Sequence, residues 1–436
     1  MTSDKKVELK RELGLFEVTL SGVGIILGAG IYALIGKAAG LAGNSVWISF
    51  GFSALVAVFT GLSYAELSSM FPKASAEHEY TLKAFGKKLA FIIGWLIILS
   101  GVIGTSTVAL GFGGYFSSFF NISIITSAFV LIIVLSLLLF YGIKETAWFA
   151  IVATLIETAG LILIIWMGIP YLGKVDYFEM PSGWAGVFQA SALVFFAYTG
   201  FESIVKLSEE TRAPEKTIPK SLILAIAISI VLYVLVAISA VSVMGWENIA
   251  KSDAPFADLA YTVLGNDAFT LLSVIALFST ANTVLLMMLG SSRIIYGMAD
   301  SFTLPNILAR VHISRRTPWV AIAVTMVISL MFIFAGDIVF IANVANFTLF
   351  VTFFVINAAL IFLRFKEPET KRPFVVPFTI GKIPVLPLIG IVFCVFMLAQ
   401  LEWTVLLVGT GLVVLGWMLS FVKVKKALYR HSGQIL

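Results

Sequence analysis

The stretch that decides the fold is GVGIILGAGI at residues 22–31, inside the first long apolar segment of the chain. A glycine costs about 1 kcal/mol relative to alanine in a helix interior. Within a membrane, interrupted backbone is tolerated only where it is buried in protein or lines a cavity. We therefore interpret this stretch as the break of a discontinuous membrane helix, whose freed amides and carbonyls bind something near the bilayer midplane. The alternative is close helix packing through Gly24 and Gly28, which have the GxxxG spacing.

The composition is that of a polytopic membrane protein. Of its 436 residues, 60% are hydrophobic and only 12% charged, and the mean hydropathy is +1.03. These values exclude a soluble domain. The polar N-terminal residues do not resemble a signal peptide. The single cysteine, Cys394, leaves no intramolecular disulfide and predicts no disulfide-linked subunit.

Twelve apolar segments are long enough to cross a hydrocarbon layer of about 30 Å. They lie at residues 15–40, 46–71, 88–117, 122–143, 147–172, 184–206, 219–245, 267–299, 317–335, 339–363, 384–401 and 403–424.

The basic residues predict the orientation of these spans. With a cytoplasmic N-terminus, all but three of the 29 Lys and Arg residues fall on the cytoplasmic side. The exceptions are Lys37, Lys174 and Lys251. This is the bias that the positive-inside rule requires. We expect both termini to be cytoplasmic and the protein to lie in the plasma membrane.

The sixth span repeats the irregularity of the first. Its centre reads FFAYTGFE at residues 195–202, with Gly200 and Glu202 in mid-span. Five spans separate the starts of the two irregular helices, and an odd number inverts the second unit relative to the first. We predict an all-α membrane protein with a 5+5 inverted repeat. The expected parts are a cytoplasmic N-terminal segment (1–14), repeat 1 (15–172), repeat 2 (184–363), spans 11 and 12 (384–424) and a cytoplasmic tail (425–436).

Four separated motifs, in order, resemble those of the amino acid–polyamine–organocation transporters. The resemblance covers roughly residues 13–424. The Ser75-Ala76 pair departs from it, because a Gly-Gly pair is usual there. The motifs are GVGIILGAGI (22–31), LSYAELSSMFPK (62–73), EETRAPEKTIP (209–219) and SSRIIYGMAD (291–300), the last followed by Leu304-Pro305 and Thr317-Pro318.

This resemblance implies a LeuT-type fold with broken helices 1 and 6, and a secondary transporter of α-amino acids. The amides of Gly28, Ala29 and Gly30 begin a half-helix, whose positive end suits a carboxylate. The ammonium would meet carbonyls at the ends of the preceding half-helices. These belong to Ile25 and Ile26 in span 1, and to Phe195 and Ala197 in span 6.

Side chains near Gly200 in span 6 have several candidate roles. Phe196 matches the family's aromatic that closes over bound substrate; the alternative is an ordinary core phenylalanine. Tyr198 either donates a hydrogen bond or packs. Glu202 either gates or titrates, or it caps the second half-helix, and we favour capping.

Glu157 lies in the middle of span 5, where an ionised carboxylate is expensive unless it is paired. Several proton-coupled members of the family have a lysine at this position. Because this chain has a glutamate there, the lysine mechanism does not transfer unchanged. We expect Glu157 to carry or sense a coupled proton. Sodium binding with Ser279 or Thr280, and a purely structural role, remain alternatives.

Other classes of function find less support in the sequence. It has no P-loop, no metal-ligand cluster and no nucleophile–base set, so we expect neither an enzyme nor a cofactor. The basic loops are a topology signal and imply no nucleic-acid partner. A neutral amino acid carried with H⁺ is the preferred interpretation. Amino acid exchange, Na⁺ coupling, and a substrate-gated sensor or a channel are the alternatives, and the oligomeric state stays open.

Overall fold

The computed structural model describes residues 11–73, 76–141, 143–300, 304–315 and 317–421, with the backbone alone at 143–151. Among them are eight apolar helical stretches long enough to cross a membrane and four shorter apolar helices. The chain is an integral membrane protein built almost entirely from helices. The expected tail at 425–436 and residues 1–10 of the expected N-terminal segment lie outside the described residues.

Helix occupies every range in which the hydropathy predicts a span. In chain order these helices are α1 (Leu15–Ile26) with α2 (Gly30–Ala42), α3 (Val46–Met70), α5 (Lys87–Phe120), α6 (Ile124–Tyr141), α7 (Ile143–Gly168), α8 (Gly183–Val194) with the 3₁₀ segments η3 (Phe195–Tyr198) and η4 (Phe201–Glu210), α9 (Pro214–Met244), α12 (Asn266–Asp300), α13 (Trp319–Ile333), α14 (Ile338–Lys366), α15 (Val385–Ala399) and α16 (Trp403–Leu419).

Shorter elements fill the connections. They are η1 (Gly43–Ser45), α4 (Ala76–Phe85), η2 (Ile169–Tyr171), α10 (Trp246–Lys251), α11 (Pro255–Leu264), η5 (Asn306–Ala309), β1 (Thr379–Ile380) and β2 (Ile383–Pro384). The two strands form an antiparallel hairpin in which Ile380 pairs with Ile383.

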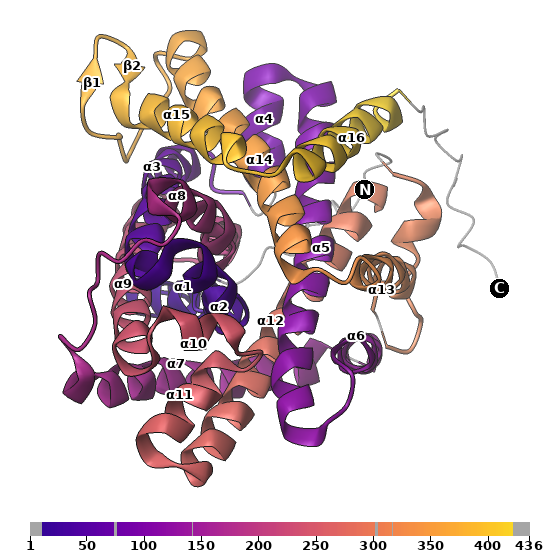
Figure 1. Ribbon diagram of the computed structural model, residues 1–436. Coiled ribbons are helices and arrows are strands. Elements are labelled where there is room, and N and C mark those ends of the chain that lie inside the picture. Colours follow the sequence, from indigo (N-terminus) through magenta and orange to yellow (C-terminus); the bar gives the residue numbers. More distant parts are fainter. Residues whose placement is uncertain (1–10, 74–75, 142, 301–303, 316, 422–436) are drawn as a thin grey trace.

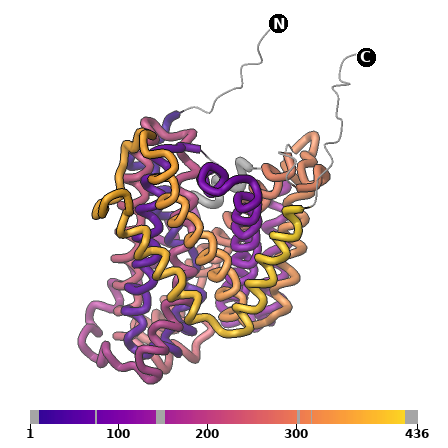
Figure 2. The backbone as a smooth tube through the Cα atoms, turned by 90° about the horizontal axis from the view of Figure 1, so that it is seen from above, coloured from indigo at the N-terminus to yellow at the C-terminus, as the bar shows by residue number. Residues whose placement is uncertain are grey.

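The long helices pack in two groups (Figure 1). In one group α3 and α1 pack against α9, and α2 packs against α8. In the other, α5 contacts α12 and α6, and α13 contacts both α5 and α6. Helix α7 bridges the groups through α9 and α12, and α14 packs on α5 and α15. Figure 2 shows α15 and α16 as a V along one side of the bundle.

Both predicted interruptions are present, and they touch each other. Helix α1 ends at Ile26 and α2 begins at Gly30, whereas η3 and η4 are separated by Thr199 and Gly200. A Cβ atom on Gly30 would lie 2.5 Å from the Cα of Ala197. Gly200 has φ +113°, and a Cβ there would lie 2.9 Å from the carbonyl oxygen of Ile25. Only glycine allows this close approach of two backbones.

A buried ion cluster ties α3 to α14 at one end of the bundle. Glu66 is fully buried and accepts hydrogen bonds from Arg364 Nε (2.9 Å), Arg364 Nη2 (2.6 Å) and the amide of Val376 (2.8 Å). Arg372 Nε lies 3.3 Å from Glu66 Oε1. The Arg372 guanidinium also donates to the carbonyl of Glu367, next to the end of α14. This cluster holds the segment between α14 and β1 against the bundle.

Candidate functional site

The two helix breaks are joined by a tyrosine from a third helix. The hydroxyl of Tyr233, in the middle of α9, lies 2.6 Å from the carbonyl oxygen of Ile26 and 2.9 Å from that of Ala197. The single hydroxyl proton is therefore shared between two carbonyls: that of Ile26, which ends α1, and that of Ala197, which lies in η3. Each carbonyl has two lone pairs, so both keep capacity for a further donor.

The amides of the first break are not all free. The amide of Ala29, which we expected to be open, donates to Thr283 Oγ1 of α12 at 2.8 Å, because Thr283 lies directly against the break. The amides of Gly28 and Gly30 make no hydrogen bond within the described residues. A Cβ on Gly28 would lie 2.9 Å from Thr283 Oγ1. The open donors at the start of α2 are thus those of the two glycines.

The aromatic side chains around the second break have separate environments. Phe196 is buried against α5 and α12, where Gly104 leaves room for its ring and Met287 lies beside it. Phe195 instead packs on Phe350 of α14, with ring centroids 4.8 Å apart. Tyr198 stacks edge-on to Tyr233 at 5.2 Å, and its hydroxyl has no partner in the described part of the chain.

Glu202 turns back to the second break. Its carboxylate accepts a hydrogen bond from the amide of Gly200 at 2.9 Å. The bonded amide belongs to Gly200, which precedes η4, and not to one of the free amides in the first turn of that helix. The sequence predicts a half-helix here, and in the structure it is a ten-residue 3₁₀ helix. Runs of this length are uncommon and often mark hinges.

Glu157 lies where α7 meets α12 and the first break. It is fully buried, and among the described residues neither carboxyl oxygen has a hydrogen-bond partner. Ser279 and Asn282 of α12 face this carboxyl. The Asn282 amide also donates to Thr154 of α7 at 3.2 Å, and the hydroxyl of Tyr32 donates to the backbone carbonyl of Glu157 at 3.1 Å.

The two candidate partners of Glu157 behave differently. Ser279 Oγ faces the carboxyl and has no hydrogen-bond partner in the described residues. Thr280 donates instead to the carbonyl of Ala276 in its own helix at 2.7 Å. The structure therefore brings Ser279 to Glu157, whereas the Thr280 hydroxyl is engaged elsewhere.

Sequence reasoning missed three polar residues of this region, namely Tyr233, Asn282 and Thr283. Each lies in the middle of an apolar span, where a polar group needs a protein partner. Their position in mid-span was the sequence signal that could have marked them as functional. It could not identify their hydrogen-bond partners, because these lie on other helices.

A sequence model of the family described as "Amino acid permease" matches residues 13–426. The chain belongs to this family. The permease is 32% identical to the branched-chain amino acid permease BcaP of Bacillus subtilis, over 98% of this chain and 95% of the relative. It is also 32% identical to the methylthioribose transporter of Bacillus subtilis, over 91% and 90% of the two chains. The vacuolar cationic amino acid transporter 4 of Arabidopsis thaliana is 26% identical, over 84% of this chain and 65% of its own length.

These relatives are transporters and permeases, and not enzymes. The permease is accordingly a multi-pass membrane transporter of a small molecule, and it belongs to the group that its four motifs resemble.

Proposed function

We propose that this permease is a secondary active transporter of neutral α-amino acids that works by alternating access. The observation that carries the proposal is the contact of two helix breaks at Gly30 and Ala197. One break offers amide donors and both offer carbonyl acceptors. Together they complement a ligand with one carboxylate and one ammonium group.

The architecture proposed for this transport is a LeuT-type fold of twelve spans with a 5+5 inverted repeat. The order of the helices supports it, because the broken helices α1–α2 and α8–η4 begin the two sets of five. We propose repeats at 15–172 and 184–363, with spans 11 and 12 at 384–424. Both termini face the cytoplasm, and the protein resides in the plasma membrane.

In the proposed site, the amides of Gly28 and Gly30 hold the substrate carboxylate, and that of Ala29 joins them by leaving Thr283. Carbonyls receive the ammonium, and Phe196 closes the site. The carbonyls are those of Ile25, Ile26, Phe195 and Ala197, while Tyr198 and Gly200 complete the wall.

The preference for a neutral substrate rests on the apolar surroundings of the site. Phe196 packs beside Gly104 and Met287, which bring no charge to balance a cationic side chain. The carboxylate of Glu202, which contacts the second break, already accepts a hydrogen bond from the amide of Gly200. The name of the BcaP relative, a branched-chain amino acid permease, agrees with this preference.

For coupling, we propose that Glu157 carries or senses a proton. Its carboxyl is buried and faces Ser279 and Asn282 of α12, with the neutral Tyr32 and Tyr233 nearby, so none of these described neighbours is a cation that would offset its charge. Binding a proton is the simplest way to neutralise this buried carboxylate. Sodium held by Glu157 and Ser279, and amino acid exchange without a coupled ion, are the competing schemes.

Uptake into proteoliposomes tests the function and the site together. Labelled leucine uptake should be inhibited by unlabelled branched-chain amino acids, and weakly by arginine or methylthioribose. Gly30→Ala should abolish uptake while the protein still inserts, since the new Cβ would strike Ala197.

Gly290→Ala is the matched control, because a Cβ there meets nothing within 4 Å. Equal uptake by both alanine variants would show that the substrate carboxylate does not bind at the first break. Stronger inhibition by arginine or methylthioribose than by leucine would overturn the neutral amino acid assignment.

A further inference from the structure

A hollow in the surface lies on the connection between α12 and α13. Its volume is about 410 Å³, and its lining residues are Arg310, Val311, His312, Ile313 and Trp319. None of them belongs to the broken helices, so the hollow is separate from the site at the helix breaks. We call it the α13 hollow.

The α13 hollow lies at the level where the membrane meets water. Trp319 is the first residue of the apolar helix α13, and tryptophan is enriched at this level of membrane proteins. The connection is also fixed to the end of α6, which packs beside α13 (Figure 1). There the Thr317 hydroxyl donates to the carbonyl of Phe140 at 3.0 Å, and the rings of His312 and Phe140 meet edge-on with centroids 5.1 Å apart. The hollow is therefore held between the ends of two apolar helices, at the depth of the lipid head groups.

The charge around the hollow has one sign. Arg310 lines it, and the chain has no Asp or Glu between Asp300 and Asp337. Within the described residues, the Arg310 guanidinium forms no ion pair. The hollow therefore offers an exposed cation to an anion from outside the protein.

His312 and Arg315 add further hydrogen-bond donors. The amide of Arg315 donates to His312 Nδ1 at 3.3 Å, so the neutral imidazole carries its proton on Nε2. The Arg315 guanidinium lies over the ring of Tyr141, the last residue of α6, 4.0 Å from its centroid. Stacking uses the face of the guanidinium and leaves its N–H edge for an acceptor.

Apolar side chains are exposed in the same hollow. Ile313 is 95% exposed and Val311 is 43% exposed. Exposed apolar side chains gathered at one place often mark a membrane or ligand contact. Together with Arg310, they form a surface that complements a molecule with an anionic head and an apolar body.

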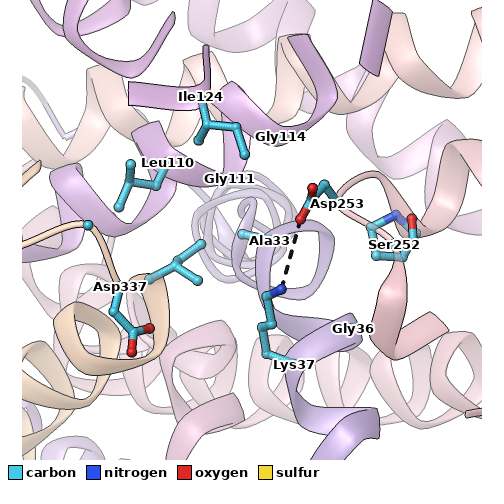
Figure 3. A pocket seen from close by; sticks show the side chains of 13 residues that line it. Ala33, Gly36, Lys37, Leu110, Gly111, Gly114, Ile124, Ser252, Asp253 and Asp337 are labelled. Atoms are coloured by element: carbon cyan, nitrogen blue, oxygen red, sulfur yellow. Dashed lines mark ion pairs between the residues drawn. The ribbon is translucent and has the colours of Figure 1, made fainter. Parts of the chain in front are cut away.

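The cavity between α2, α5 and the start of α14 differs in this respect (Figure 3). Lys37, Asp253 and Asp337 line that cavity, and Lys37 Nζ lies 3.9 Å from Asp253 Oδ1. Charges of both signs therefore balance each other there. In the α13 hollow no lining residue is acidic, so only an outside anion balances its charge.

We infer that the α13 hollow binds an anionic phospholipid of the adjoining leaflet, which is the cytoplasmic leaflet in the proposed orientation. Arg310 and His312 contact the phosphate, while Ile313 and Trp319 contact the glycerol and the first carbons of the acyl chains. Basic pockets between membrane helices bind anionic head groups on this principle. The bound lipid bridges the ends of α6 and α13.

Native mass spectrometry of the purified permease in detergent tests the inference. Titration gives the Kd of the first bound lipid, and dioleoyl-phosphatidylglycerol should bind more tightly than the zwitterionic dioleoyl-phosphatidylcholine. Arg310→Gln should raise the Kd for phosphatidylglycerol about fivefold, the size of one basic residue at a membrane surface. Lys216→Gln removes the same charge at an exposed position of α9 outside the hollow, and its Kd should match the wild type.

A second pair of variants tests the apolar half of the surface. Ile313→Ser should raise the Kd for phosphatidylglycerol about tenfold, whereas Ile313→Leu should leave it unchanged. The Ile313 side chain is exposed, so both variants should unfold at the wild-type temperature in lipid-free detergent. sn-Glycerol 3-phosphate has the phosphate without the chains, and it should not displace the lipid.

The inference is overturned if phosphatidylcholine binds as tightly as phosphatidylglycerol, or if Arg310→Gln and Lys216→Gln have equal Kd values. Displacement of the lipid by sn-glycerol 3-phosphate would overturn it in favour of a soluble phosphate compound. These measurements involve no transport, so their outcome is independent of the proposed function.

Discussion

Glu66 and Glu157 are both fully buried, yet their surroundings are opposite. Glu66 meets two guanidinium groups and a backbone amide. Glu157 meets neutral side chains of α12, and in the described residues its carboxyl oxygens have no hydrogen-bond partner. The first carboxylate is fully compensated at one end of the bundle, and the second is left uncompensated beside the helix breaks.

The difference separates a structural charge from a functional one. A buried ion pair is expensive to break, because removing one partner leaves the other charge without compensation. A buried group whose partners are absent is instead a candidate for binding something that arrives from outside. The two kinds of buried group should therefore differ in how much they contribute to the stability of the folded protein.

The largest effect is expected at Glu66. Glu66→Gln leaves Arg364 and Arg372 buried without a counter-charge, and should cost about 3–5 kcal/mol of stability. Thermal unfolding of the purified permease in detergent measures it. Glu247→Gln, at an exposed position of α10, is the control and should change little. If the Glu66→Gln protein unfolds at the same temperature as the wild type, the cluster does not stabilise the fold.

A smaller effect is expected at Tyr233. Tyr233→Phe removes the hydroxyl between the carbonyls of Ile26 and Ala197, and should cost about 1 kcal/mol, as interhelical hydrogen bonds in membranes do. The same change should weaken substrate affinity, because the two breaks lose their common tether. Uptake kinetics and thermal unfolding measure both effects. Tyr261→Phe, at an exposed ring of α11, is the matched control; equal kinetics in the two variants would exclude the tether.

The smallest change in stability is expected at Glu157. Glu157→Gln replaces an acid by its neutral isostere and breaks no ion pair, so stability should change by less than about 1 kcal/mol. Transport should change more. Under the proposed proton coupling, wild-type uptake should rise as external pH falls, whereas the variant should show a flat profile.

Uptake measured across pH, with and without Na⁺, decides this point. Acid stimulation that survives in Glu157→Gln would exclude the residue from proton coupling. A steep dependence of wild-type uptake on Na⁺ would favour the sodium scheme.

Local patterns were sufficient for one part of this molecule. The glycines at residues 22–31 and Gly200 marked both interruptions, and the depth of Glu157 in its apolar span marked it as unusual. These are signals that a single segment carries, because backbone breaks and buried charges are costly wherever they occur in a membrane.

The contacts that complete the site are of another kind. Tyr233 meets Ile26 across 207 residues, Thr283 meets Ala29 across 254, and Arg364 meets Glu66 across 298. Their geometry depends on the register between helices, which no local spacing encodes. For the same reason the sequence could not show that the Ala29 amide is already engaged.

That engaged amide has a consequence for selectivity. If ligand binding uses the Ala29 donor, it is an exchange in which the newcomer must outcompete the Thr283 hydroxyl. A carboxylate can do so, because hydrogen bonds to an ionised acceptor are roughly twice as strong as neutral ones. An ester, an amide or a sugar hydroxyl gains almost nothing by the swap. In the proposed carboxylate site, Thr283 would thus set a threshold of acceptor strength, and a compound of the right shape but without a charged acceptor would not displace its hydroxyl.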